Sequence, residues 1–277
     1  MPDLSARDGT KLAYEAIGQG RPVVCLPGGP MQDSVYLGDL GGLSGYLRLI
    51  RFDLRGTGRS AAPEDMTSCR CDRLVDDVEA LREHLGLERV DLLAHCPGAN
   101  LAEWYAIRHP DRVGRMALVT PSPVGAGVAV TSEVRREIVR SRAGEPWFGP
   151  ASAAFEAIQA GRATDDDWDQ IAPFTYGRWD AAAQTHYAGS ENQRNAEAAA
   201  AYVEGYAPDA VRPALGTVDA PVLLLAGEVD ISAPPSAVAE LASLFPDATL
   251  TTQPGAGHYP WLDDPAAFTR PVAGFLA

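Results

Sequence analysis

The 277-residue sequence has no excess of basic residues, and it has no long apolar run. Its 23 Lys and Arg residues are outnumbered by 37 Asp and Glu residues, which gives a net charge of −14. A chain this acidic does not favour nucleic acid or an anionic membrane surface, so we expect neither as a partner. No segment reaches the apolar length needed to cross a bilayer, so the sequence predicts no membrane anchor.

Cysteine is also scarce, and residues 1–8 lack the apolar core of a secretory signal peptide. We therefore expect a cytoplasmic protein whose thiols stay reduced. An even number of cysteines allows disulfide pairs, but a chain of this size without an export signal favours free thiols. Cys69 and Cys71 have no second ligand pair at metal-binding spacing, so we expect no metal site. We expect no other cofactor either. The four cysteines are Cys25, Cys69, Cys71 and Cys96.

Repeats and low-complexity linkers are absent, and a hydrophobic content of 46% suits one sizeable domain. Short apolar runs alternate with helical periodicity at both ends of the chain. This alternation predicts an α/β fold with a mostly parallel central sheet flanked by helices, in which the first two strands could form an antiparallel edge. Strands are expected at 11–17, 22–26, 47–52, 89–93, 115–120, 221–226 and 248–252. Core helices are expected at 72–85, 98–108, 235–245 and 265–276.

The middle of the chain, 123–213, shows no strand signal and is typical of several helices. An all-helical insert between two core strands predicts a lid over an active site. We therefore expect 1–122 and 214–277 to form the two parts of the core, with 123–213 as the helical cap. The lid helices are expected at 132–143, 150–160, 165–171, 181–188 and 191–206.

The most informative segment is 94–99, AHCPGA, between an apolar strand and a helix. Small residues two before and two after Cys96 let strand and helix pack closely around a strained turn that exposes the central side chain. This is the pattern of a nucleophile elbow, whose central residue is usually serine. Cysteine is the nucleophile here through its thiolate, unless it is an engineered replacement of serine.

Three further landmarks follow expected strands. Gly28 and Gly29 allow a sharp turn that points backbone N–H groups into a cleft, although an ordinary loop has the same pattern. Residues 53–60, DLRGTGRS, invite a phosphate-loop interpretation but fit neither common glycine-rich nucleotide motif. Asp230 and His258 each come just past a later strand. Nucleophile, acid and histidine can therefore converge on one edge of the sheet.

With these landmarks the whole chain resembles the α/β-hydrolase superfamily, and within it the proline-iminopeptidase-like branch. The resemblance implies that Cys96 is the nucleophile, His258 the general base and Asp230 the acid that orients the base. It also implies an oxyanion hole built from the backbone N–H groups of Gly29 and residue 97. Pro97 has no N–H, so this sequence departs from the pattern at that position.

The departures at Cys96 and Pro97 affect the expected chemistry. Cys96 would form a thioester acyl-enzyme, which amines and thiols attack well relative to water. Pro97 suits the first turn of a helix, but losing one oxyanion donor typically costs a factor of about 10²–10³ in rate. Either a side chain from a loop or the lid replaces that donor, or the reaction needs little oxyanion stabilisation.

The sequence therefore predicts a hydrolase for a small-molecule ester, thioester or peptide amide. An acyltransferase, cyclase or lyase on the same scaffold is the alternative. A catalytically inactive binding protein is a third hypothesis, which the full set of triad positions disfavours. The oligomeric state and the identity of the substrate stay open.

Candidate substrate-binding residues come from the lid and from the loop that contains Gly28 and Gly29, the glycine loop. Gly28 borders the expected cleft, and Trp147 and Trp179 are candidates for the apolar underside of the lid. The resemblance also makes the lid carboxylates Glu197 and Glu204 candidates for binding a substrate amine, although exposed helix faces carry many glutamates. The other histidines, which are expected to be structural or solvated, are His84, His95, His109 and His186. For His186 a substrate contact is the alternative.

Overall fold

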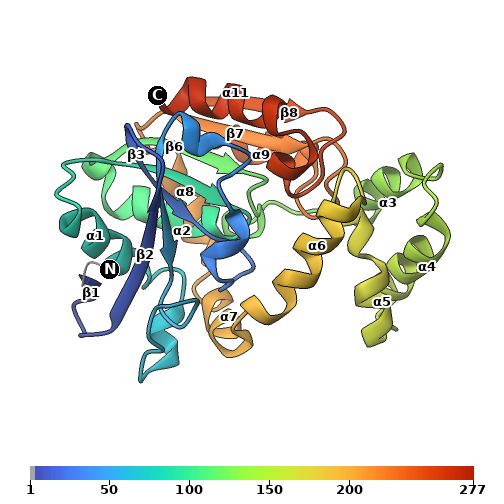
Figure 1. Ribbon diagram of the computed structural model, residues 1–277, viewed down its shortest axis with the longest axis horizontal. Coiled ribbons are helices and arrows are strands. Elements are labelled where there is room, and N and C mark those ends of the chain that lie inside the picture. Colours follow the sequence, from blue (N-terminus) through green and yellow to red (C-terminus); the bar gives the residue numbers. More distant parts are fainter. Residues whose placement is uncertain (1–3) are drawn as a thin grey trace.

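A computed structural model describes residues 4–277 and contains one eight-stranded sheet, in the order β1-β2-β4-β3-β5-β6-β7-β8 (Figure 1). Strands β4, β3, β5, β6, β7 and β8 are parallel, whereas β1 and β2 run antiparallel at one edge. The predicted mostly parallel α/β fold is therefore confirmed. The strands are β1 (Leu4–Ser5), β2 (Lys11–Ile17), β3 (Pro22–Leu26), β4 (Arg48–Asp53), β5 (Val90–His95), β6 (Val113–Val119), β7 (Val222–Gly227) and β8 (Ala248–Gln253).

The antiparallel edge is built differently from the one predicted. β2 pairs with β4, so that Ala13 lies opposite Asp53 and Ile17 opposite Leu49. β3 lies between β4 and β5 and is parallel to both. The expected pairing of the first two strands is therefore wrong. β3 is apolar and buried along almost its whole length, which suits a central strand with both faces covered, whereas β2 alternates between buried and exposed residues.

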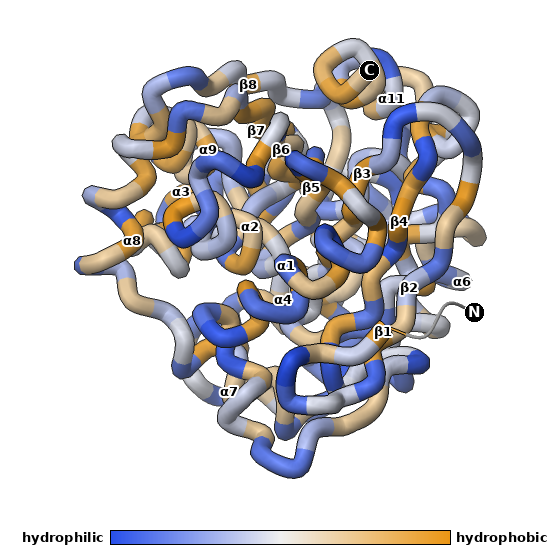
Figure 2. Tube along the Cα trace, turned by 90° about the vertical axis from the view of Figure 1, so that its left-hand side faces the viewer, coloured by the Kyte–Doolittle hydropathy of each residue, from blue (hydrophilic) through white to orange (hydrophobic). Residues whose placement is uncertain are grey.

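Helices cover both faces of the sheet. One face packs against α1 (Val75–His84), α2 (Gly98–Arg108), α8 (Pro208–Leu215) and α9 (Pro235–Ala242). The other packs against α11 (Pro265–Leu276), α10 (Pro260–Asp263) and the short 3₁₀ helices η1 (Ser34–Leu37) and η2 (Leu43–Gly45). Figure 2 shows hydrophobic stretches along the central strands. Because both faces are covered, every residue of β5 is buried.

The insert stands to one side of the core. In Figure 1, α3, α4 and α5 form a separate group, and α6 and α7 connect it back to the core. Over 123–213, all of which is described, the insert contains no strand. Its predicted end falls inside α8, a helix that contains Pro213 and packs against α2. The lid helices are α3 (Ser132–Ser141), α4 (Phe148–Gln159), α5 (Asp165–Gln170), α6 (Ala181–Ser190) and α7 (Ala196–Val203).

The last part of the insert pairs with the loop that follows Gly29. Gln32 and Arg194 form an isolated antiparallel β-bridge. On either side of it, the Asp33 N–H donates to the Gln193 carbonyl at 2.8 Å and the Asn195 N–H donates to the Met31 carbonyl at 3.1 Å. Lid and glycine loop are thus joined by backbone hydrogen bonds.

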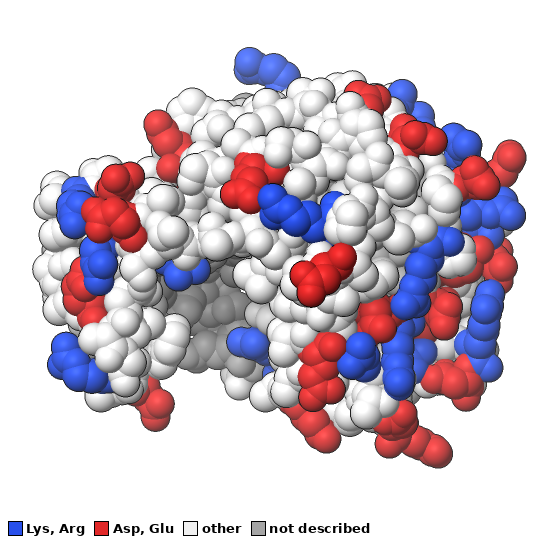
Figure 3. All heavy atoms as spheres, turned by 180° about the vertical axis from the view of Figure 1, so that it is seen from behind, with Lys and Arg blue, Asp and Glu red and all other residues white. Residues whose placement is uncertain are grey.

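All four cysteines are free thiols, and Cys25, Cys69 and Cys71 are buried. Burial raises the pKa of Cys25 to about 12 and that of Cys69 to about 11, so both thiols stay protonated at neutral pH. Among the described residues, no helix combines the length and apolarity needed to cross a bilayer. Acidic and basic side chains are interspersed on the face shown in Figure 3, so the net charge is not gathered into one patch there.

Candidate active site

Cys96 occupies the sharp turn between β5 and α2. Its φ of 52° lies in the left-handed region, which costs a non-glycine residue of order 1–3 kcal/mol. The surrounding backbone holds it there. The Cys96 N–H donates to the Val119 carbonyl at 3.1 Å, and the Cys96 carbonyl accepts from the Ser122 N–H at 3.0 Å. The turn leaves the Cys96 side chain partly exposed, while the other thiols are buried.

The glycines around the turn are required by close backbone packing. A Cβ at Gly98 would lie 2.6 Å from the carbonyl oxygens of Leu26 and Pro27. A Cβ at Gly28 would lie 2.9 Å from both the Cys96 Cβ and the His95 carbonyl oxygen. The glycine loop and the elbow therefore lie directly against each other, with no room for a side chain between them.

His258 and Asp230 form a buried pair beside Cys96. The His258 Nδ1 lies 2.7 Å from the Asp230 Oδ2, and the His258 ring centroid lies 4.8 Å from that of His95, the residue before Cys96. Burial alone lowers the pKa of His258, but the charges of Asp230 and Cys96 raise it well above its ordinary value. The site can therefore hold an imidazolium between a carboxylate and a thiolate.

His95 lies behind the elbow in a buried chain of hydrogen bonds. The Gly28 N–H donates to the Tyr36 Oη at 2.7 Å, and that oxygen lies 2.7 Å from the His95 Nδ1. Burial lowers the pKa of His95 well below its ordinary value, so the ring is neutral. It accepts the Tyr36 proton at Nδ1 and donates from Nε2 to the His258 carbonyl at 3.0 Å. His95 thereby has the structural role expected of it.

Gly29 and Pro97 occupy the two expected oxyanion-donor positions. Gly29 has a φ of 108°, and within the described chain no acceptor engages its N–H. Pro97 has a φ of −66° at the start of α2 and no N–H, and its carbonyl accepts from the Tyr202 hydroxyl at 2.6 Å. The backbone at residue 97 therefore has no N–H to donate.

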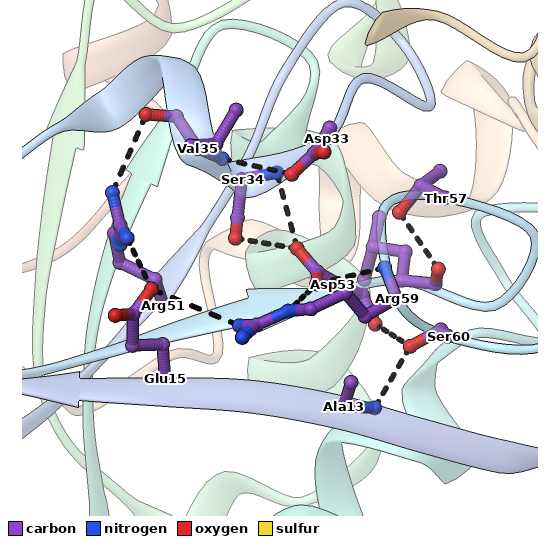
Figure 4. Close-up of polar contacts among 11 residues, drawn as sticks. Ala13, Glu15, Asp33, Ser34, Val35, Arg51, Asp53, Thr57, Arg59 and Ser60 are labelled. Atoms are coloured by element: carbon purple, nitrogen blue, oxygen red, sulfur yellow. Dashed lines mark hydrogen bonds and ion pairs between the residues drawn. The ribbon is translucent and has the colours of Figure 1, made fainter.

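Residues 53–60 contact Ser34 through the Asp53 carboxylate (Figure 4). The buried Asp53 carboxylate accepts from the Ser34 Oγ at 2.5 Å and from the Ser34 N–H at 3.2 Å. It also accepts from the Arg59 N–H at 3.1 Å. A Cβ at Gly58 would lie 2.6 Å from the Asp53 Cγ, so glycine is needed for this close approach. The 53–60 segment thereby holds Ser34, which follows Gly29 closely in the sequence.

Aromatic rings from the lid reach the residue after His258. The Tyr259 ring centroid lies 4.6 Å from that of His186 and 5.0 Å from that of Tyr176. His186 bonds the Tyr176 hydroxyl at 2.8 Å through Nδ1 and the Tyr36 carbonyl at 3.2 Å through Nε2. The expectation of a solvated His186 is therefore wrong, because these contacts hold its ring in the site wall. Trp179 joins this wall through Tyr176, with ring centroids 5.3 Å apart.

Two of the predicted substrate-binding residues lie elsewhere. Trp147 packs inside the lid, 4.9 Å from the Phe174 ring centroid and 4.9 Å from the Arg142 guanidinium carbon. Glu204 is exposed, and its charge acts on Arg70. The residues that the structure gathers around the elbow are Gly28, Gly29, Cys96, Pro97, Asp230 and His258.

Tyr36 and Tyr259 lie near the site but were not predicted from the sequence. Tyr36 lies in a short 3₁₀ helix with no motif of its own, and only the fold brings it to His95. Tyr259 directly follows the predicted base, and this adjacency was the available signal.

Comparison with known proteins gives the same fold. A family model described as alpha/beta hydrolase fold matches residues 21–265. The chain is 28% identical over 275 residues to a non-heme haloperoxidase of Rhodococcus erythropolis, covering 93% of each protein. It is 25% identical over 295 residues to a proline iminopeptidase of Xylella fastidiosa, covering 92% of this chain and 89% of that protein. A solved proline iminopeptidase of Mycobacterium smegmatis superposes with a TM-score of 0.79 at 24% identity, covering 99% of this chain and 97% of the other.

Proposed function

The chain belongs to the α/β-hydrolase fold family, and we propose that it is an acyl-transferring hydrolase with Cys96 as nucleophile, His258 as base and Asp230 as orienting acid. The observation that carries this proposal is the Asp230–His258 pair beside the elbow turn that holds Cys96. The carboxylate lies 2.7 Å from the imidazole Nδ1, and the imidazole ring centroid lies 4.8 Å from that of His95, the residue before Cys96. A nucleophile, a base and a group that orients the base are what covalent acyl catalysis needs.

The first half-reaction acylates the enzyme. Cys96 gives its proton to His258 and attacks the carbonyl carbon of the substrate, so an S–C bond forms and the carbonyl electron pair moves onto oxygen. The Gly29 N–H stabilises this oxyanion. When the carbonyl re-forms, the bond to the leaving group breaks, and the leaving group takes the proton from the His258 imidazolium.

The second half-reaction releases the acyl group. Water, or an amine or thiol acceptor, gives a proton to His258 and attacks the thioester carbonyl. Collapse of this second intermediate breaks the S–C bond, and the Cys96 sulfur takes the proton back. The protein supplies every group for this cycle, so we propose that it needs no cofactor.

The walls of the site favour an uncharged acyl group. Tyr36, Tyr176, His186 and Tyr259 form a continuous set of ring contacts next to His258. We therefore propose a small ester, thioester or peptide amide whose acyl part is apolar or aromatic.

Trapping the acyl-enzyme tests the proposal. After incubation with activated acyl thioesters, intact-protein mass spectrometry should show the mass gain of one acyl group, and peptide mapping should place it on Cys96. The Cys96→Ala variant is the matched control, because it keeps the three buried thiols. Absence of an adduct with every acyl donor, alongside turnover of an unactivated substrate, would overturn covalent catalysis.

Pro97 favours a second candidate function. With one backbone donor missing, the Cys96–His258 pair could move a proton in a lyase or cyclase reaction that passes through no tetrahedral oxyanion. Such a reaction would exchange a substrate proton with solvent. In deuterium oxide, label in recovered substrate without an acyl adduct would support this function over acyl transfer.

A further inference from the structure

The oxyanion site has one backbone donor where acyl transfer normally uses two. The Gly29 N–H has no acceptor within the described chain, and Pro97 has no N–H to offer. Loss of one donor typically costs a factor of about 10²–10³ in rate. Tyrosine hydroxyls can act as oxyanion donors, and the region around Cys96 is rich in tyrosine.

Most of these phenols are already engaged by the protein. The hydroxyl of Tyr36 bonds His95 at 2.7 Å and that of Tyr202 bonds the Pro97 carbonyl at 2.6 Å. The Tyr176 hydroxyl bonds His186 at 2.8 Å. The hydroxyl of Tyr259 has no hydrogen-bond partner among the described residues, although its ring is enclosed by other rings.

The Tyr259 ring lies beside both the proposed base and Tyr36. Its centroid is 5.5 Å from that of His258 and 6.2 Å from that of Tyr36, whose hydroxyl binds the Gly28 N–H. On its other sides it contacts His95 at 5.3 Å and His186 at 4.6 Å. These contacts hold the ring in one place, so a hydroxyl here is a donor fixed before substrate binds.

We propose that the Tyr259 hydroxyl is the second oxyanion donor, in place of the N–H that Pro97 lacks. This assignment rests on the proposed acyl transfer at Cys96. As the thiolate adds to the carbonyl carbon, the electron pair that moves onto oxygen is met by the Gly29 N–H and the Tyr259 O–H. Both hydrogen bonds are released when the carbonyl re-forms and the leaving group departs, and neither donor gives up its proton.

Burial and nearby charges keep the Tyr259 hydroxyl protonated, so that it can donate a hydrogen bond. Burial raises the pKa of Tyr259, and the charges of Cys96 and Asp230 raise it further.

The test compares two reactions of Cys96 in the Tyr259→Phe variant. Acylation by an activated ester passes through an oxyanion, whereas alkylation by iodoacetamide displaces iodide at a saturated carbon and forms none. We expect the variant to acylate about 10²-fold more slowly or worse, and to alkylate at the wild-type rate. Tyr206→Phe is the matched control, since it removes another half-buried hydroxyl, on a ring that packs against Tyr202 and not against His258, and both rates should stay within twofold of wild type.

A double-mutant cycle with Pro97→Ala separates oxyanion stabilisation from a structural role. Alanine restores the backbone N–H, so Pro97→Ala should change acylation little alone but recover most of the rate lost in Tyr259→Phe. Equal acylation by Tyr259→Phe and wild type would overturn the assignment. So would equal losses in acylation and alkylation, or failure of Pro97→Ala to rescue. A wild-type protein that alkylates but never acylates would overturn the proposed acyl transfer itself.

Discussion

The His95 Nε2 lies 3.0 Å from the backbone carbonyl oxygen of His258, so the residue before Cys96 holds the main chain of His258. The Thr120 Oγ1 donates to the same carbonyl at 2.9 Å. Two donors from the ends of adjacent strands therefore fix the backbone at His258. The position of the base is set by the sheet as well as by its side-chain contact with Asp230.

Tyr36→Phe should destabilise the protein. Removing the hydroxyl leaves the Gly28 N–H and the neutral His95 Nδ1 without partners in a buried region, at a cost of about 1–3 kcal/mol per group. Urea denaturation should show a lower free energy of unfolding. Tyr46→Phe is the control, since that side chain is 64% exposed and should unfold like wild type. Equal stability of the two variants would mean that the Tyr36 bonds contribute nothing.

Asp230→Asn should abolish most activity while leaving the fold intact. An amide in place of the carboxylate no longer favours the imidazolium or the reactive His258 tautomer, and an equivalent change in a serine-protease triad costs about 10⁴-fold in kcat. The acylation rate should fall by a similar order, with an unchanged thermal melting curve. Asp209→Asn, an exposed change in α8, serves as the control. A loss under tenfold would argue against the assigned role.

Alkylation of Cys96 should be fast at neutral pH and depend on His258. The raised pKa of His258 makes its ring a ready acceptor of the Cys96 proton, and the thiolate is the form that reacts. In His258→Gln this acceptor is gone, so the iodoacetamide rate at neutral pH should fall at least about tenfold below that of wild type. At pH about 10 both proteins should react alike. Superimposable profiles would show that the two side chains do not form a pair.

Glu103→Gln should stabilise the protein at mildly alkaline pH. Glu103 is fully buried in α2, its carboxylate accepts from the Asn100 amide at 3.2 Å, and burial raises its pKa from 4.5 to about 8. Between these pH values the unfolded chain releases a proton that the folded chain retains, so wild-type stability falls as pH rises. The advantage of Glu103→Gln should be absent near pH 4 and largest above pH 8, by thermal denaturation. A pH-independent difference would rule out this linkage.

The fold was predictable because its main signals are local. Apolar runs followed by glycine or polar residues locate both the strand ends and the residues placed there, including Cys96, Asp230 and His258. The pairing of β2 with β4 was not predictable in this way, because strand order depends on contacts between distant segments. The helix over Pro208–Leu215 was missed because Pro213 suggested a boundary, and packing against α2 outweighs that local preference.

The candidate site was likewise predictable only in part. Residue types that carry chemistry at motif positions could be read from the chain, and so could the missing donor at Pro97. The contribution of Tyr259 could not, because the sequence does not tell whether a phenol is engaged by a neighbour. His186 was interpreted as solvated for the same reason, since its partners Tyr36 and Tyr176 are distant or unremarkable in sequence.

The β-bridge between Gln32 and Arg194 constrains how this enzyme can be altered. A lid taken from a relative and grafted at its outer boundaries would keep the bonds at Asp33 and Asn195 that border the bridge only if its backbone followed the same path at 193–195. A graft chosen for a new acyl pocket would therefore also disturb the Gly29 donor a few residues earlier. A change of the lid that alters substrate range therefore also affects the loop near the proposed Gly29 donor. A functional chimera has to carry 31–33 and 193–195 from the same parent.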